Sequence, residues 1–347
     1  MNLPLKLTVP IVALATLFVP LALSAQSAPP EMPPKLDSAI ADGLAFLARQ
    51  QRYDGSFEAT GPRVALTGLA AIAFLSAGHV SDDGVHGATV RRAVDFLLSQ
   101  APADGYYGAV DGSRMYGHCI VMVALAEAMG VERDPRLRQR MRQLLVQGAG
   151  VIRYAQTIKK DPVHAGGWRY EPNSADSDLS LSGWCALALR ATQNLGIYVP
   201  REHIDGAIHY VMLCNDRASG GFVYQPGGQP YAAMTGVALL NLYLMGAADR
   251  PETAAALKYL VANPPSLKAT GKPYYAMYYA AQAAFHAGGE TWSAIWPSVS
   301  QDLLRAQEPD GGWPPSPTPE EPGRIYSTSM AVLTLTVPYR LLPVYQR

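Results

Sequence analysis

Charged residues and cysteines are both scarce in this sequence. Only 16% of its 347 residues are charged, against about 25% in an average protein. Lys and Arg (28 together) balance Asp and Glu (28 together), so the chain lacks the basic excess of a nucleic-acid binder and we expect no nucleic-acid partner. Apolar residues make up 49% of the chain, which excludes disorder as its overall class.

The three cysteines are Cys119, Cys185 and Cys214, too few and too unevenly spaced for a disulfide framework. At most one bridge can form among them, and we expect three buried thiols on helices, packed as small apolar groups. Sustained alternation of apolar and polar residues is also absent, so strands are not expected. Phosphate loops, dinucleotide fingerprints, zinc-protease motifs and nucleophile elbows are missing as well.

Residues 1–25 have the pattern of a secretory leader. Lys6 is the only charged residue before Glu31, and residues 7–23 between them are almost wholly apolar. Small residues follow this run, as signal peptidase requires. The alternative is an uncleaved membrane anchor, which the short run and its two prolines make less favourable. We therefore expect an exported protein, periplasmic or secreted, either free or associated with a membrane.

Two further segments follow the leader. Residues 26–35 are rich in proline and are expected to form a stiff linker. Residues 36–347 then form the folded domain, which is long enough to bury a sizeable core.

The folded part repeats a two-helix unit at intervals of about fifty residues. Each unit has an amphipathic helix, a turn with glycine and an aromatic residue, and a second helix rich in small apolar residues. In the fifth unit the turn is degenerate and is expected at 273–275. The two helices of successive units are expected at 39–51 and 64–77, 90–100 and 116–129, 141–147 and 179–195, 204–214 and 232–245, 253–261 and 277–287, and 299–307 and 326–337.

Six helix pairs predict an all-α fold, an (α/α)6 toroid of six helix-pair repeats. No helix with a single apolar face can bury that face alone, and stacking the pairs creates a continuous core. An open solenoid is the alternative. We favour a closed ring because the turn glycines allow a tight backbone path and the turn aromatics can wedge between neighbouring repeats.

Two turns carry a resemblance to a known family. The turn from Gln307 to Trp313 (QEPDGGW) is similar to the glutamine–tryptophan repeat of squalene and terpene cyclases, and the turn from Gln51 to Phe57 is a looser copy. From Leu36 to its end, the chain resembles the prenyltransferase and squalene-cyclase repeat superfamily. This family includes class II terpene cyclases, protein prenyltransferase β subunits and exported bacterial proteins of unassigned role, the group to which the chain looks most similar.

The resemblance implies a candidate catalytic acid. Class II cyclases protonate an alkene with an Asp-x-Asp-Asp motif, whose acid is kept protonated in an apolar cavity. Asp176 and Asp178 match the first and third positions, whereas Leu179 replaces the final Asp. Asp178 is therefore the candidate acid and Asp176 its neighbour. The same residues precede a predicted helix, and we favour N-capping as their role.

His118 is a second catalytic candidate, an auxiliary base at the mouth end of the second inner helix, although we favour a capping or hydrogen-bonded structural role for it. Protein prenyltransferases bind zinc through Asp, Cys and His. The adjacent pair His118-Cys119 points in directions about 100° apart on a helix, and no ligand spacing supports a zinc set. We expect neither a metal nor a cofactor.

Arginines and tyrosines near the starts of the inner helices are candidate ligand-binding residues. A ring of Arg side chains can receive an anionic group, unless each pairs with a nearby carboxylate: Arg63 with Asp54, Arg114 with Asp111, and Arg324 with Glu321. Tyrosine has an apolar body and a polar tip, which suits a cavity that holds a lipid or a sugar. The ligand-binding candidates are Arg63, Arg114, Arg324, Tyr116, Tyr231, Tyr278 and Tyr326.

Three functional hypotheses follow. We favour a ligand-binding or scaffold toroid without catalysis, because Leu179 breaks the acid motif and no zinc set is found. The second is an isoprenoid cyclase-like enzyme with Asp178 as its acid; squalene cyclases resemble two fused toroids, so it also needs a protein partner or a homodimer. The third is a polysaccharide-active (α/α)6 enzyme, which requires two carboxylates across a groove, with Glu58 and Asp111 as candidates.

Overall fold

The computed structural model describes residues 32–58, 61–268, 271–318 and 321–346. The predicted leader and most of the predicted linker lie outside these residues. The described part contains no strand, only isolated bridges such as that between Trp168 and Asp178. Within these same ranges, no helix combines the length and the apolarity needed to cross a bilayer.

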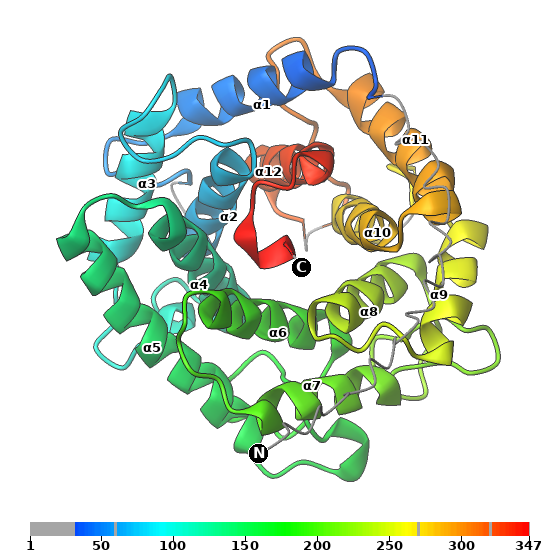
Figure 1. Ribbon diagram of the computed structural model, residues 1–347. Helices are drawn as coiled ribbons and strands as arrows, with labels where there is room; N and C mark the ends of the chain where they lie inside the picture. The colour runs from blue at the N-terminus through cyan, green and yellow to red at the C-terminus, as the bar shows by residue number, and fades with distance from the viewer. Residues whose placement is uncertain (1–31, 59–60, 269–270, 319–320, 347) are drawn as a thin grey trace, which may run out of the picture. The chain divides into compact units, whose positions relative to one another are not determined.

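The α-helices of the described residues form two concentric rings (Figure 1). The outer ring consists of α1 (Leu36–Gln50), α3 (Gly87–Ser99), α5 (Pro135–Thr157), α7 (Arg201–Leu213), α9 (Pro251–Ala262) and α11 (Gly289–Ala306). The inner ring consists of α2 (Arg63–Ser76), α4 (Arg114–Val131), α6 (Leu179–Asn194), α8 (Ala232–Leu244), α10 (Pro273–Ala287) and α12 (Gly323–Leu335).

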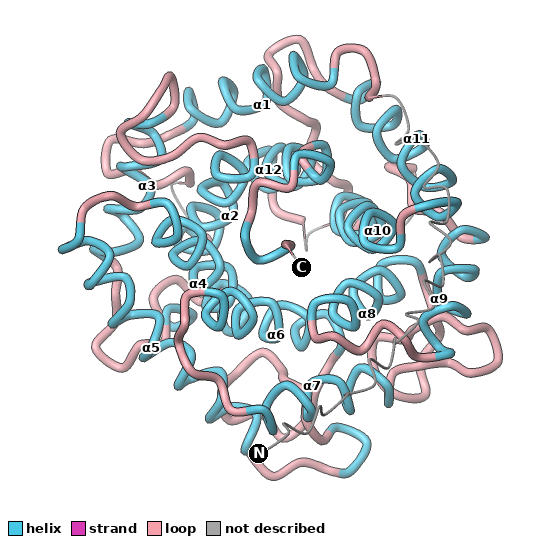
Figure 2. The backbone as a smooth tube through the Cα atoms, in the orientation of Figure 1, coloured by secondary structure: helices cyan, strands magenta, loops and turns pink. Residues whose placement is uncertain are grey.

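The inner ring is closed. Each inner helix packs against the inner helix that follows it in the chain, and the last one, α12, packs against the first, α2. Figure 2 shows the same arrangement as helices joined by loops, with the C-terminal segment turning into the centre. The prediction of an (α/α)6 toroid is thereby confirmed, and the open solenoid is excluded.

Burial explains why the two rings differ in sequence. Every residue of α2 from Val64 to Ser76 is buried, since an inner helix has neighbours on all sides. Helix α3 buries only one face, which includes Val90, Val94 and Leu97, and exposes its charged face. Small residues allow the inner helices to approach closely: a Cβ atom on Gly236 of α8 would lie 2.9 Å from the Tyr279 carbonyl carbon of α10.

The turns that lead from outer to inner helices are built alike. The Trp313 indole Nε1 donates to the Leu303 carbonyl (2.8 Å) in the helix before it, and the Trp313 amide donates to Thr328 Oγ1 (3.0 Å) in the helix after it. Trp168 repeats this pattern, since its indole donates to Ile152 O (2.7 Å) and its amide to Ser182 Oγ (2.9 Å). These buried aromatics therefore fasten the two helices of their own pair to each other.

A glutamine precedes three of these turns and joins neighbouring repeats. Gln307 Nε2 donates to Gly311 O in its own turn and to Ala39 O in α1, both at 2.8 Å. The second bond links the last repeat to the first and closes the outer ring. The other two glutamines make the same pair of bonds: Gln51 to Gly55 O and Thr89 O, and Gln156 to Gly166 O and His203 O.

Helix boundaries differ from the prediction in three repeats. Helix α5 begins at Pro135 rather than 141, because Asp134 caps it by accepting from the Arg136 amide (2.8 Å) although its first turns are polar. Helix α11 begins at Gly289 rather than 299 and contains Pro297. Residues 273–275, expected as the fifth turn, form the first turn of α10, where proline is well tolerated.

Candidate functional site

A cavity of about 300 Å³ lies at the N-terminal ends of the inner helices. Four of its lining residues, Pro62, Ser113, Lys272 and Pro322, are the N-cap residues of α2, α4, α10 and α12. The described residues that line the cavity are Pro62, Ala65, Leu66, Leu69, Ser113, Tyr116, Ile120, Tyr170, Trp184, Lys272, Tyr275, Pro322 and Tyr326.

Aromatic rings form much of the cavity wall. Tyr116 and Tyr170 lie with their ring centroids 6.0 Å apart, and Trp184 packs edge-on against Tyr279 behind the wall at 6.4 Å. Burial raises the pKa of Tyr116, Tyr275 and Tyr326 well above that of a free phenol, so these hydroxyl groups stay neutral. The wall therefore combines stacking faces with neutral hydrogen-bonding groups.

Lys272 is the only charged residue among the described lining residues. Its charge also lowers the pKa of nearby Glu321, although burial dominates and leaves that pKa raised overall. Glu321 Oε1 accepts from the Tyr275 amide (2.9 Å) at the start of α10. Lys272 therefore places one positive charge at the cavity mouth, close to the Glu321 carboxyl group.

The C-terminal segment occupies the other end of the inner ring (Figure 1). The short 3-10 helix Pro343–Tyr345 places the Tyr345 hydroxyl in hydrogen-bond contact with the hydroxyl of Tyr278. The Val344 amide donates to Glu127 Oε1 (3.2 Å) of α4. Tyr278 thus packs against this segment and is not among the lining residues of the cavity.

Asp178 is the N-cap residue of α6, as the favoured prediction had it. Its Oδ1 accepts from the Leu181 amide (2.9 Å) and from Ser180 Oγ (2.6 Å), and the residue is fully buried (0% exposed). Its Oδ2 lies 3.3 Å from the Arg169 guanidinium. Burial raises the pKa of Asp178, opposed by these hydrogen bonds and by Arg169. Asp178 does not line the cavity.

Arg169 organises the surroundings of Asp178. It lies 3.3 Å from Asp176 Oδ2 as well, donates to the Tyr224 hydroxyl (3.1 Å), and stacks over the Tyr170 ring at 4.5 Å. The hydroxyl groups of Tyr170 and Tyr224 are 2.6 Å apart. The two candidate aspartates therefore share one arginine, and that arginine supports a cavity-wall tyrosine.

His118 is buried between α4 and α5, away from the cavity wall. Its Nε2 lies 3.1 Å from the Gly148 carbonyl, and burial lowers its pKa to about 4, so the ring is neutral. The described residues contain no group of three His, Cys, Asp or Glu side chains that could hold a metal ion.

The three candidate arginines are each paired with a carboxylate of a turn. Arg63 pairs with Asp54, as the sequence suggested. The other two expected pairings were wrong. Arg114 pairs with Glu171 (3.2 Å), and Arg324 pairs with Asp310 (2.6 Å) and with Glu308.

The carboxylates that we expected to pair with Arg114 and Arg324, Asp111 and Glu321, cap helices instead. Asp111 Oδ2 accepts from the Val64 amide (2.6 Å) and the Ala65 amide (3.3 Å), so it caps α2 from the next repeat. Glu321 caps α10 in the same way, through the Tyr275 amide. Carboxylates of neighbouring loops thus accept hydrogen bonds from the unpaired N–H groups at the starts of these helices. Because Asp111 and Glu321 are engaged in this way, they do not pair with the arginines.

Of the predicted ligand-binding residues, the structure brings Tyr116 and Tyr326 together in the cavity wall. Tyr231 is the N-cap residue of α8, is 44% exposed and does not line the cavity. Sequence reasoning missed Tyr170, Trp184 and Lys272. For Lys272 a signal was present, because it immediately precedes an inner helix, the same position that made Arg63 a candidate.

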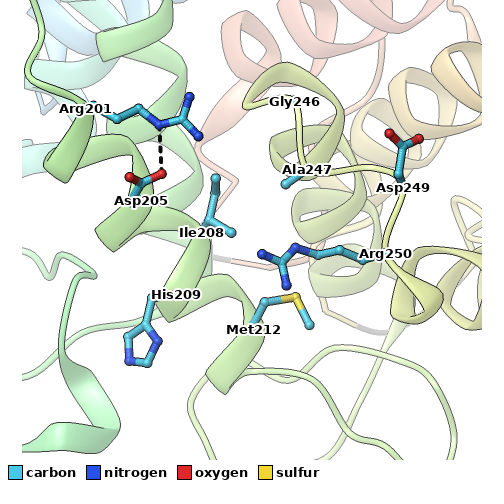
Figure 3. A pocket seen from close by; sticks show the side chains of 9 residues that line it. All are labelled: Arg201, Asp205, Ile208, His209, Met212, Gly246, Ala247, Asp249 and Arg250. Atoms are coloured by element: carbon cyan, nitrogen blue, oxygen red, sulfur yellow. Dashed lines mark hydrogen bonds and ion pairs between the residues drawn. The ribbon is translucent and has the colours of Figure 1, made fainter.

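A larger and shallower hollow of about 580 Å³ lies on the outside of the ring, between α7 and the start of α9 (Figure 3). An ion pair between Arg201 and Asp205 (2.8 Å) lines one side of the hollow, and the Arg250 side chain extends into the hollow from the opposite side. The hollow is polar and open, so it lacks the enclosure of a small-molecule site.

No known family profile matches this chain, and no curated protein is similar to it in sequence. Solved structures are similar to it in fold. An inactive variant of the α-1,6-mannanase GH76A of Salegentibacter sp. HEL1_6, in complex with α-1,6-mannotriose, has 9% identity and a TM-score of 0.63, and the match covers 88% of this chain and 99% of that one.

Three further solved structures are similar to the chain in fold. The type II terpene cyclase MstE from Scytonema has 15% identity and a TM-score of 0.56 over 89% of this chain and 99% of its own. A variant of it, in complex with its substrate geranylgeranyl dihydroxybenzoate, has a TM-score of 0.55 at 16% identity, over 89% of this chain and 98% of its own. A protein from Actinoplanes has 17% identity and a TM-score of 0.53, over 87% and 98%. At these identities the comparisons show that the chain shares the α/α toroid fold with glycan-active and terpene-cyclising enzymes.

Proposed function

We propose that this chain is an exported, ligand-binding α/α toroid that takes an apolar, isoprenoid-like chain with an anionic end into its central cavity and does not turn it over. The observation that carries the proposal is the composition of the wall: aliphatic and aromatic side chains with a single charge, the ammonium group of Lys272. Apolar walls with a few placed polar groups are typical of small-molecule sites.

The choice between a lipid and a glycan rests on carboxylates. A glycosidase needs two of them across its groove, about 5–9.5 Å apart depending on the mechanism. None of the described lining residues is Asp or Glu. Asp111, a candidate from the sequence, has its Oδ2 engaged by two backbone amides of α2. The wall therefore favours binding of an apolar chain over hydrolysis of a sugar.

The anionic end is argued from Lys272, because its ammonium group is the one charged group among the described lining residues and favours a negative group at the mouth. The substrate bound by the Scytonema cyclase variant, geranylgeranyl dihydroxybenzoate, has the same division into an isoprenoid chain and a polar group. The substrate of that cyclase variant therefore supports the class of ligand that we propose.

Binding can be tested with three matched probes: farnesyl monophosphate, farnesol and mannotriose, titrated by calorimetry. We expect farnesyl monophosphate to bind at least tenfold more tightly than farnesol, and mannotriose not to bind. Ala65→Phe, which fills the cavity, should weaken farnesyl monophosphate at least tenfold, whereas Met212→Phe in the outer hollow should leave it unchanged. Binding of mannotriose alone, or of none of the three, would overturn the proposal.

One observation favours the cyclase hypothesis as a second candidate. Ser180 Oγ donates to Asp178 and also contacts the Tyr116 hydroxyl, which lies in the cavity wall. Two hydroxyls thus connect the carboxyl group to the cavity, and both would have to reverse their donor direction to carry a proton from Asp178 outward. Asp178→Asn keeps an N-cap side chain and removes the acid. If the wild type cyclises a linear polyprenyl substrate and this variant does not, the second candidate replaces the first.

A further inference from the structure

Two of the three cysteines face each other between two neighbouring helices of the inner ring. Cys119 of α4 and Cys185 of α6 have their Sγ atoms 3.2 Å apart, and both side chains are fully buried thiols. Cys214 follows α7 in the outer ring and is also a buried free thiol. The chain therefore offers one pair of thiols in contact and one thiol apart from them.

We propose that Cys119 and Cys185 form a disulfide in the exported protein. The S–S bond of a disulfide is about 2.05 Å long, so the two sulfur atoms need to approach by little more than an ångström. The partners lie on neighbouring inner helices, which already pack against each other. The bond would thus join two helices that are already in contact.

The bridge would act on the cavity wall. Tyr116 lies one helical turn before Cys119, and Trp184 immediately precedes Cys185; both aromatic residues line the cavity. A covalent link between α4 and α6 fixes the spacing of these two wall residues. The proposal itself is independent of which ligand the cavity binds.

The reaction is a two-electron oxidation. The two thiols lose two protons and two electrons and form one S–S bond. The oxidant is a disulfide, either that of a thiol–disulfide oxidoreductase in the export compartment or glutathione disulfide in vitro. Its own S–S bond breaks, and it leaves as two thiols. A mixed disulfide with one of the cysteines is the intermediate.

The bridge forms while the chain folds, not after. Burial raises the pKa of Cys185 well above its usual value, an effect that Cys119 reinforces, and the thiolate is the reactive form. Attack on a disulfide is therefore slow once the ring has closed around the pair. The same burial protects the finished bridge from reductants.

Peptide mapping tests the proposal. The full chain is refolded in a glutathione redox buffer, quenched with acid, unfolded, alkylated with N-ethylmaleimide and digested without reduction. We expect a disulfide-linked peptide containing Cys119 and Cys185, and an alkylated Cys214. Alkylation of all three cysteines, or a bridge that includes Cys214, would overturn the proposal.

Thermal unfolding of the wild type with and without reductant tests whether the bridge stabilises the fold. Two variants then test which cysteines form it. Unfolding the oxidised wild type in the presence of a phosphine reductant should lower its Tm by about 5 °C, because the bridge closes a long loop in the unfolded chain. Cys119→Ala should lose this sensitivity to reductant, and Cys214→Ala should retain it. Equal sensitivity of the two variants would contradict the assignment of the pair.

Discussion

The bond that closes the outer ring can be tested with a single substitution. Gln307 Nε2 donates to Ala39 O, 268 residues away in the chain, as well as to Gly311 O in its own turn. Gln307→Ala removes both hydrogen bonds and leaves two carbonyl groups without this donor. A net contribution of about 1 kcal/mol per bond predicts a loss of about 2 kcal/mol in the free energy of unfolding.

The structure supplies its own comparison. Gln51 makes the equivalent pair of bonds, to Gly55 O (3.1 Å) and Thr89 O (2.9 Å), and also accepts from Arg92 Nε (3.0 Å). Its position lies inside the run of repeats and not at the seam between the first and the last. Gln51→Ala should therefore cost at least as much as Gln307→Ala. Gln139→Ala, on the exposed face of α5, serves as the surface control.

Urea unfolding followed by circular dichroism measures these free energies, and thermal unfolding should show a fall in Tm of about 4 °C for Gln307→Ala. The two glutamine variants should fall together while the control stays within about 0.5 kcal/mol of the wild type. If Gln51→Ala is destabilised and Gln307→Ala is not, the seam is open in solution and the closed ring is refuted.

Two further predictions concern the interior. Burial raises the pKa of Glu127 to about 8, so the folded chain keeps a proton that the unfolded chain releases; stability should fall as pH rises from about 4.3 to 8, at up to about 1.4 kcal/mol per pH unit. Glu127→Gln should flatten this slope in urea unfolding at pH 5.5 and 7.5, and parallel profiles would contradict the assignment. Gly311 and Gly196 both have positive φ (88° and 69°), but only at Gly311 would a Cβ atom meet backbone, 2.4 Å from Asp42 O. Gly196→Ala should therefore lower the free energy of unfolding by about 1–2 kcal/mol, and Gly311→Ala should lower it by at least twice as much. Thermal unfolding measures both, and equal losses would show that the backbone at Gly311 can shift to make room for a Cβ atom.

The repeat pattern was sufficient to predict the fold because each signal in it is local. Apolar spacing within a helix, a glycine at a turn and an aromatic residue after it all report on contacts within one unit, and six such units imply the ring. Helix α5 shows where this fails. Its first turns are polar and Asp134 caps it, and the apolar pattern finds only the middle part, 141–147, of a helix that runs from Pro135 to Thr157.

The site was predicted less well because it depends on neighbours in space. Tyr116 and Tyr326 could be named from their positions at inner-helix starts. Trp184 lies in the second turn of α6, and only the curvature of the ring shows that it faces the cavity rather than a neighbouring helix. The true partners of Arg114 and Arg324 come from the geometry of the loops, which spacing along the chain does not reveal.

Three carboxylates of the described residues act as caps where inner helices begin. Asp111, Asp178 and Glu321 are the carboxylates that stand at inner-helix N-termini, and each accepts hydrogen bonds from backbone amides there. A carboxylate in this role stabilises the helix start and holds the loop of one repeat against its neighbour. Among the described residues, the cavity wall therefore holds aromatic and aliphatic side chains, one ammonium group and no carboxylate, and the proposed binding role rests on that composition.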